Sequence, residues 1–183
     1  YLHPGHHAAY YPGAKPIQLK LLFSVPEGRI LGAQAIGTEG VEKRIDVIAT
    51  AMAGGITASA LAGLELAYAP QYASAKDPIN LLGYVADNVR DGRTRTVQWH
   101  ELDAVRAAGA MLIDVRSEGE HAASSIPGAV NVPLDRLRDH HRELGDAPLV
   151  VHCQVGQRGH TAARLLEQLG TLEGVAKFGF QGV

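Results

Sequence analysis

The chain has 183 residues, with 17 Lys and Arg against 19 Asp and Glu, a net charge of −2, and a single cysteine. This charge balance gives no basic surface for nucleic acid, and no apolar run approaches the ~18 residues of a membrane span. One cysteine excludes an internal disulfide and any multi-cysteine metal or redox pair. With 46% hydrophobic residues, we expect one or two globular domains, and we place the protein in the cytoplasm.

The first half of the sequence predicts an α+β layer that begins with a hairpin. Apolar residues alternate over residues 17–23, and a second run over 30–36 reads as the return strand, with turn residues at 26–29 between them. Gly32 within the second run indicates a bulge or a close backbone contact. Two antiparallel strands followed by helices are therefore expected here.

Three helices are predicted after the hairpin. Helical spacing of apolar residues runs from residue 41 to 52 and ends at the glycines of 54–55. Residue Thr57 is placed to cap a short helix through residue 64, and Asp77 precedes a proline that opens a third helix. This half has few side chains suited to catalysis and a large apolar helical surface, so we predict a docking domain.

The second half predicts an α/β domain with a parallel sheet flanked by helices. Residues 88–95 are polar and lack an apolar period, which indicates an exposed linker and two domains, residues 1–90 and 91–183. Continuous apolar runs over 111–115 and 149–152 are typical of buried parallel strands. Helices are expected at residues 101–108, at 134–141 and from about 159 to 169.

The single cysteine, Cys153, stands at the carboxyl end of the second of these strands, where ligands bind in such sheets. The loop that follows contains Gly156 and leads into a helix, so its backbone N–H groups can converge on an anion. Arg158 adds a permanent positive charge with bidentate geometry. A lone cysteine is ordinarily a small buried hydrophobe, but a structural thiol needs none of these neighbours. We therefore predict a nucleophilic thiolate, with Cys153 and Arg158 as the catalytic residues.

Histidines near the N-terminus and near this loop do not predict a metal site. His3, His6 and His7 lack the i, i+4 register of a helical ligand pair, and no third ligand type accompanies them. His152 and His160 flank the cysteine loop, where they either tune Cys153 or serve at a strand end and a helix surface. We expect no metal.

Residues 153–158 resemble the active-site loop of single-domain rhodaneses, and the resemblance covers most of residues 95–180. Rhodaneses place four residues between Cys and Arg, as here, whereas the related cell-cycle phosphatases have one more, so sulfur transfer is favoured over phosphate hydrolysis. The chain departs from the usual pattern at 124–126 and 178–182, which leaves the sulfur acceptor open. The other matching segments are residues 101–102, 112–116, 118–121, 126–129 and 131–134.

The resemblance implies that Cys153 takes the outer sulfur of thiosulfate or a persulfide and passes it, as its own persulfide, to a second thiophile. Small-molecule sulfur donors and thiol acceptors are thus the expected partners. Arg116 either assists an anionic substrate at the mouth of the site or forms a surface ion pair with Glu120. Asp114 is interpreted as an acceptor for loop amides. The expected anion-binding loop comprises Gln154, Val155, Gly156, Gln157 and Gly159.

Residues 1–88 resemble the C-terminal dimerisation domain of pyridine nucleotide-disulfide oxidoreductases. The nearest branch holds coenzyme A-disulfide reductases, NADH oxidases and polysulfide reductases, some of which carry a rhodanese domain after the dimerisation domain. This implies a homodimer through residues 1–90. Tyr11 and Tyr68, with Tyr10 as the alternative to Tyr11, would reach the partner's reductase site, or they pack at a dimer surface. The matching segments are residues 7–14, 30–34, 43–46, 65–70 and 74–80.

In those enzymes, domains for FAD and NAD(P)H precede this region. The sequence has no G-x-G-x-x-G motif and no second cysteine, so we expect this chain alone to hold no cofactor, with FAD, NAD(P)H and coenzyme A used by the full-length enzyme. The first residue is Tyr1, which favours a piece of a longer protein.

The leading hypothesis is therefore the C-terminal region of a coenzyme A-disulfide, persulfide or polysulfide reductase. The alternatives are a stand-alone thiosulfate sulfurtransferase with a dimer scaffold, and a non-catalytic anion-binding interaction module.

Overall fold

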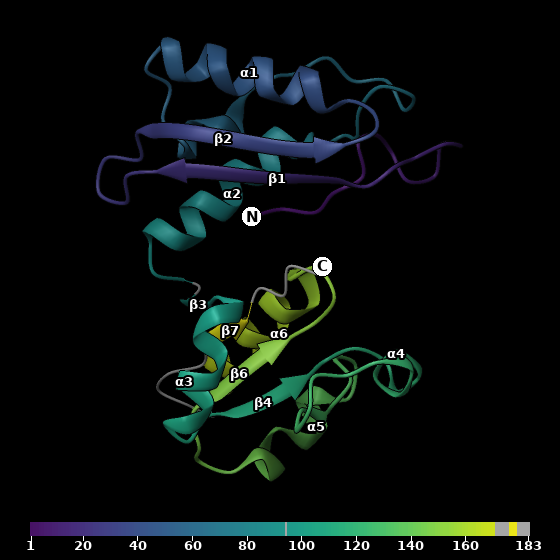
Figure 1. The fold of residues 1–183 in the computed structure, drawn as a ribbon, viewed down its shortest axis with the longest axis vertical. Coiled ribbons are helices and arrows are strands. Elements are labelled where there is room, and N and C mark those ends of the chain that lie inside the picture. Colours follow the sequence, from purple (N-terminus) through teal and green to yellow (C-terminus); the bar gives the residue numbers. More distant parts are fainter. Residues whose placement is uncertain (94, 171–175, 179–183) are drawn as a thin grey trace. The chain divides into compact units, whose positions relative to one another are not determined.

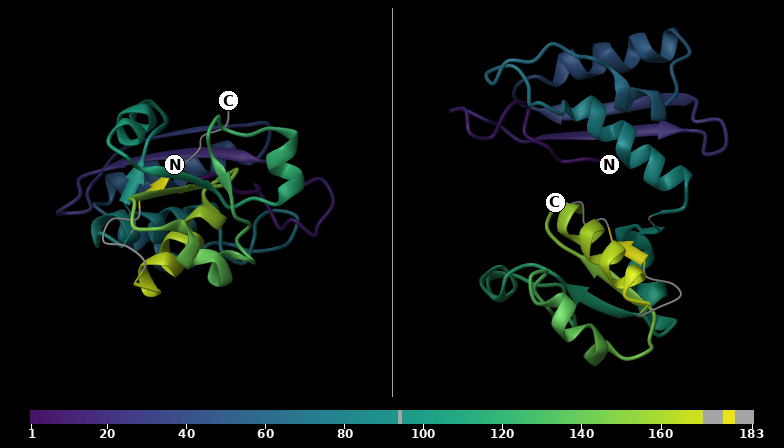
Figure 2. Two further views of the ribbon diagram at one scale, coloured as in Figure 1. Left: turned by 90° about the horizontal axis from the view of Figure 1, so that it is seen from below. Right: turned by 180° about the vertical axis from the view of Figure 1, so that it is seen from behind.

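The computed structural model describes residues 1–93, 95–170 and 176–178. The chain divides into two compact units, Tyr1–Gly92 and Arg93–Val183, each of which is described by itself (Figures 1 and 2). The predicted α+β and α/β classes of the two halves are confirmed. The domain limits at residues 90 and 91 stay a prediction.

The first unit is built on an antiparallel hairpin of β1 (Ile17–Phe23) and β2 (Ile30–Gly37), as predicted. The register shifts between Leu22, which pairs with Gly32, and Phe23, which pairs with Ile30, so a bulge lies at Leu31, next to the glycine for which a bulge or a close backbone contact was expected. Helix α1 (Val41–Ala53) packs against β2, and α2 (Pro78–Arg90) packs against the 3₁₀ turn η1 (Ser59–Gly63) (Figure 1).

The helices of this unit differ from the predicted ones in three details. The buried residues of α1 are Arg44, Ile48 and Ala51, whereas Met52 is 46% exposed. Thr57 Oγ1 does accept a bond from the Ala60 N–H, but only a 3₁₀ turn follows it. Residues 88–90, predicted as linker, belong to α2, because Arg90 at its last turn pairs with Asp87 and donates to Ser59 Oγ.

A buried ion pair joins three separate segments of the first unit. Arg44, 1% exposed, donates from Nη2 to Asp77 Oδ2 at 2.8 Å and to the carbonyl of His6 at 2.7 Å. Asp77 also caps α2, accepting from the Ile79 N–H at 3.0 Å, while Asn80 reaches back to the Asp77 N–H. Because both charges are removed from water, each depends on the other for compensation.

The second unit is a parallel sheet with helices on both faces. The strands are β3 (Arg95–Val97), β4 (Met111–Asp114), β5 (Val130–Asn131), β6 (Leu149–His152) and β7 (Ala176–Phe178), in the order β3-β7-β6-β4-β5. The helices are η2 (Trp99–Glu101), α3 (Leu102–Ala107), α4 (Glu118–Ala123), α5 (Leu137–His140), η3 (His141–Leu144) and α6 (Gln157–Gln168). Helix α4 was not predicted, and α3 and α5 are shorter than expected.

Alternation along the two central strands sends side chains into two apolar clusters. Ile113 and Val151 pack in a cluster with Leu166 of α6, and Leu112 and Val150 pack in another with Leu102 of α3. The continuous apolar runs in the sequence therefore do reflect strands covered on both faces. Among the described residues, no helix is both long and apolar enough to cross a membrane.

Replacing Arg44 by Met is expected to lower the free energy of unfolding of the first unit by about 3–5 kcal/mol, because it leaves the Asp77 carboxylate buried without its partner. Urea denaturation followed by circular dichroism measures this loss. Lys43→Met is the matched control on the same helix, since Lys43 Nζ lies 3.9 Å from Asp77 and is partly exposed. Equal losses in the two variants would contradict the prediction.

Candidate active site around Cys153

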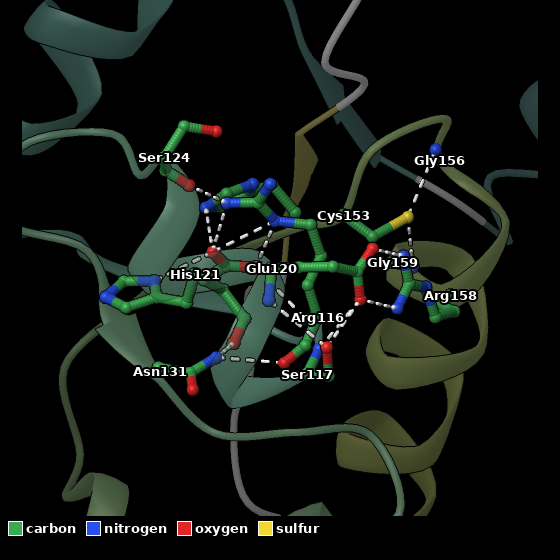
Figure 3. Close-up of polar contacts among 12 residues, drawn as sticks. Arg116, Ser117, Glu120, His121, Ser124, Asn131, Cys153, Gly156, Arg158 and Gly159 are labelled. Atoms are coloured by element: carbon green, nitrogen blue, oxygen red, sulfur yellow. Dashed lines mark hydrogen bonds and ion pairs between the residues drawn. The ribbon is translucent and has the colours of Figure 1, made fainter.

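The cysteine loop connects the end of β6 to the start of α6, as the sequence predicts. Cys153 is 1% exposed and belongs to the same apolar cluster as Ile113 and Val151. Gly156 adopts φ 89°, a conformation that favours glycine, and this lets the chain turn from the loop into the helix. The turn therefore places the first turn of α6 next to the side chain of Cys153 (Figure 3).

The Cys153 sulfur serves as the cap of helix α6. Its Sγ accepts hydrogen bonds from the backbone N–H groups of Gly156 at 3.2 Å and Gly159 at 3.3 Å (Figure 3). These are the N-cap and N3 positions of a helix whose N-cap residue offers no side-chain cap. Two amides and the positive end of the helix dipole thus meet at the sulfur, an arrangement that stabilises negative charge there.

The other residues of the predicted anion-binding loop differ in their exposure to solvent. Gly156 and Gly159 are buried, whereas Gln154, Val155 and Gln157 are exposed. Two of the predicted loop amides, those of the buried glycines, donate to Sγ in the described part of the chain. The exposed side chains instead form the outer surface of the loop.

Arg158 is held by Glu120 from the first turn of α4. Its two terminal nitrogens each donate to a different Glu120 oxygen, both at 2.7 Å (Figure 3). This pairing raises the pKa of Arg158, and the same hydrogen bonds lower the pKa of Glu120 to about 2. Sequence reasoning missed this role of Glu120, although the spacing of Ser117 and Glu120 has the pattern of a capping box.

Arg116 does not pair with Glu120, so that interpretation was wrong. Its guanidinium donates from Nη2 to Asp114 Oδ2 at 2.7 Å and to the Ser124 carbonyl at 2.6 Å. The nearby carboxylate of Asp114 is fully buried and therefore requires a counterion, which explains the choice of partner. Whether Arg116 also assists a substrate stays a prediction.

Asp114 is the acceptor at the end of β4, as interpreted from the sequence, but it receives more than backbone amides. Besides the Arg116 N–H at 3.0 Å and the Arg116 guanidinium, it is 2.9 Å from His121 Nδ1. Burial raises the pKa of Asp114, but the hydrogen bonds from Arg116 and His121 outweigh it and hold that pKa well below its usual range. His152 Nε2 lies 3.9 Å from the same carboxylate, and burial lowers the pKa of His152.

A pocket of about 630 Å³ opens beside Arg158. Its wall combines the start of α4 with the segment that precedes α5, so both charged and apolar side chains line it. The lining residues are Val115, Ser117, Glu118, Gly119, Pro133, Leu134, Asp135, Arg136 and Arg158.

The predicted tyrosines lie in the first unit and are exposed. The hydroxyls of Tyr10 and Tyr68 are 2.8 Å apart, and this hydrogen bond raises the pKa of Tyr68. Tyr11, the favoured residue of the sequence analysis, instead packs edge-on against His7. The structure therefore brings Tyr68 together with the alternative residue, Tyr10.

The N-terminal histidines contact protein groups. His6 and His7 are buried, and His6 Nδ1 accepts from the Lys15 N–H at 2.9 Å. Within residues 1–93, 95–170 and 176–178, no group of three His, Cys, Asp or Glu side chains is arranged to hold a metal ion.

Among the residues that the structure describes, the turn between β6 and α6 does not fit the pyrophosphate of FAD or NAD(P)H. Such cofactors place their pyrophosphate on a glycine-rich turn between a strand and a helix. The glycines of the turn between β6 and α6 direct their amides to Cys153 Sγ, and the sequence has no G-x-G-x-x-G motif.

Comparison with known proteins identifies both halves. Residues 98–182 match the rhodanese-like domain, and residues 2–78 match the pyridine nucleotide-disulphide oxidoreductase dimerisation domain. The chain therefore consists of a dimerisation domain of this kind followed by a rhodanese-like domain.

Within that class, the chain matches the C-terminal part of coenzyme A disulfide reductases and a persulfide reductase. The structure of reduced Bacillus anthracis CoADR-RHD is 46% identical over 97% of this chain, with a TM-score of 0.93. The NAD-dependent persulfide reductase of A. fulgidus is 36% identical over 97%, with a TM-score of 0.86. This chain spans 32% of each of those two chains.

The coenzyme A disulfide reductase of Staphylococcus aureus (strain bovine RF122 / ET3-1) is 48% identical over 82 residues, which is 45% of this chain and 19% of that protein. Another curated coenzyme A disulfide reductase, from strain JH9, is 46% identical over the same length. The chain thus spans about a fifth of these relatives.

The two glycines that donate to Cys153 are expected to respond oppositely to alanine. Gly156→Ala places a side chain at φ 89° and should lower the free energy of unfolding of the second unit by about 1–2 kcal/mol. Gly159→Ala adds a Cβ 3.6 Å from the Val151 carbonyl, an ordinary contact, within a helix, and should raise stability by up to about 1 kcal/mol. Urea titration of both variants measures the difference, and an equal loss in both would refute the expectation.

Asp114→Asn is expected to cost about 3 kcal/mol of stability near neutral pH, because it removes the charge that Arg116 neutralises. The depressed pKa of Asp114 means that the folded chain binds fewer protons there than the unfolded chain. Its contribution is therefore fully present above the ordinary Asp pKa of about 4 and is lost as pH falls toward the depressed value. Denaturation at about pH 7 and about pH 3 should show the difference between wild type and variant shrinking in acid. The exposed Asp139→Asn serves as control, and a constant difference would contradict the prediction.

Proposed function

We propose that this chain is the dimerisation and sulfur-transfer region of a FAD- and NAD(P)H-dependent reductase acting on coenzyme A disulfide, persulfides or polysulfide. The observation that carries the proposal is the position of Cys153 Sγ, which accepts from two backbone amides at the N-terminus of α6. These two N–H groups are oriented to stabilise negative charge on the sulfur, and a thiolate is the nucleophile that sulfur transfer requires.

In the first step, the Cys153 thiolate attacks the outer sulfur of the donor. With thiosulfate, a new S–S bond to Cys153 forms, the bond to the inner sulfur breaks, and sulfite leaves with the bonding electron pair. With an organic persulfide, the leaving group is the corresponding thiolate. Charge is conserved in both cases, because the thiolate and the thiosulfate dianion give the Cys153 persulfide anion and the sulfite dianion. An organic persulfide anion likewise gives the Cys153 persulfide anion and an organic thiolate.

In the second step, a thiophile attacks the terminal sulfur of the Cys153 persulfide. The S–S bond breaks, the acceptor keeps the sulfur, and the electron pair returns to Cys153 as thiolate. The amides of Gly156 and Gly159 are placed to stabilise the negative charge that alternates between the cysteine sulfur and the transferred sulfur. Arg158 in the first turn of α6, together with Arg116, would attract the anionic donor, with Gln154, Val155 and Gln157 forming the surface over which it enters.

The first unit would supply the homodimer contact, which its match to a dimerisation domain supports. Tyr68 with Tyr10, whose hydroxyls are hydrogen-bonded to each other, or with Tyr11, the next residue after Tyr10, would extend toward the partner's reductase site and contact coenzyme A there. FAD and NAD(P)H would supply the reducing electrons and be held by domains outside these residues.

The experiment is a thiosulfate-to-cyanide transfer assay on the purified chain. We expect the wild type to form thiocyanate and Cys153→Ala to fall to the background rate, because no other residue of the chain carries a thiol. Mass spectrometry after thiosulfate treatment should show one added sulfur atom in the wild type alone. Cys153→Ser, compared by its unfolding midpoint, controls for loss of the cap on α6. Background rates in a folded wild type would refute the proposal.

A further inference from the structure

The guanidinium edge with which Arg158 would recognise an oxyanion is already occupied within the chain. Arginine binds carboxylates, phosphates and similar anions through paired parallel N–H groups. Both terminal nitrogens of Arg158 donate to Glu120, one to each oxygen, at 2.7 Å (Figure 3). A thiosulfate or sulfite that binds this edge therefore meets a carboxylate in its place.

Glu120 is fixed in this position by its own helix. Its Oε2 accepts from the Ser117 N–H and from the Ser117 hydroxyl, each at 3.0 Å, and its own N–H donates to Ser117 Oγ at 3.3 Å. This is the capping box of α4, which holds the carboxylate independently of Arg158. An approaching anion must therefore break the hydrogen bonds between Glu120 and Arg158 before it can bind that edge of the guanidinium.

The pair is also accessible enough to exchange. The Arg158 and Glu120 side chains are 37% and 34% exposed, and Arg158 lines the pocket of about 630 Å³. The buried pair of Arg116 and Asp114, with 12% and 0% exposed, has no such access to solvent. An anion in the pocket can therefore reach Arg158 and compete with Glu120 for it.

We propose that Glu120 determines donor specificity as an internal competitor: it occupies the anion-binding edge of Arg158, and an anionic sulfur donor binds only by displacing it. This rests on the proposed sulfur transfer, since it concerns which donors enter the same site. The carboxylate of Glu120 repels a dianion more strongly than a monoanion, so the competition weakens the binding of thiosulfate most. Donors that carry less charge are affected less. Glu120 thereby favours organic donors of low charge over inorganic ones.

The direct test is calorimetric binding of thiosulfate to the full chain in a Cys153→Ala background, which permits no turnover. Adding Glu120→Gln should tighten thiosulfate binding about three- to tenfold, because the neutral amide no longer competes for Arg158. In the Cys153 enzyme, the same substitution should lower KM for thiosulfate by a similar factor. It should change KM for the monoanion benzenethiosulfonate by less.

Two further variants separate competition from structural damage. Glu120→Asp keeps the charge but shortens the side chain, so its thiosulfate affinity should fall between those of wild type and Glu120→Gln. Glu143→Gln alters an exposed acid that pairs with His140 and should leave affinity unchanged. A merely structural role for Glu120 would weaken binding, which is the opposite direction.

Unchanged or weaker thiosulfate binding in both Glu120 variants would overturn the inference. Failure of the proposed function gives a different result, namely no Cys153-dependent thiocyanate in any variant. The binding measurement in the Cys153→Ala background does not depend on that activity, so the two failures are distinguishable.

Discussion

The second unit depends on a hydrogen-bonding constraint at the start of α6, where the sulfur of Cys153 satisfies two amides that would otherwise lack an acceptor. Meeting this constraint requires the positive φ of Gly156 and the close approach of Gly159 to the end of β6. The strand, the loop and the helix must consequently keep one relative position. The geometry that directs two amides to the Cys153 sulfur is the same geometry that holds the sheet and its covering helix together.

Two arginine–carboxylate pairs flank this loop, and burial separates their roles. Asp114 is fully buried and binds Arg116 together with His121, which fixes the end of β4. Arg158 lines a pocket, and its partner Glu120 is about one third exposed, so water and solutes reach this pair. Breaking the Asp114–Arg116 pair leaves an uncompensated charge in the protein interior. The Glu120–Arg158 pair is partly solvated, so it can exchange partners at a small cost in free energy.

The sequence was sufficient where local signals agreed with the tertiary structure. The alternation over β1, the start of α2 at the proline after Asp77 and the Cys153 loop were all predicted from neighbouring residues. The partner of Glu120 was not predicted correctly, because both Arg116 and Arg158 are available to it. The buried carboxylate of Asp114 binds Arg116, and this leaves Arg158 for Glu120. The shortest strands of the sheet were also missed, since a strand such as β5, with two residues, has no period and is defined by its distant neighbour β4.

In the first unit, the carboxylate of Asp77 both caps α2 and neutralises Arg44 of α1, which in turn binds the carbonyl of His6. None of these three segments can detach without leaving a charge or a helix end unsatisfied in the interior. The segment around His6 and helices α1 and α2 should therefore open as one cooperative unit, so that their amides exchange hydrogen at the same rate of opening.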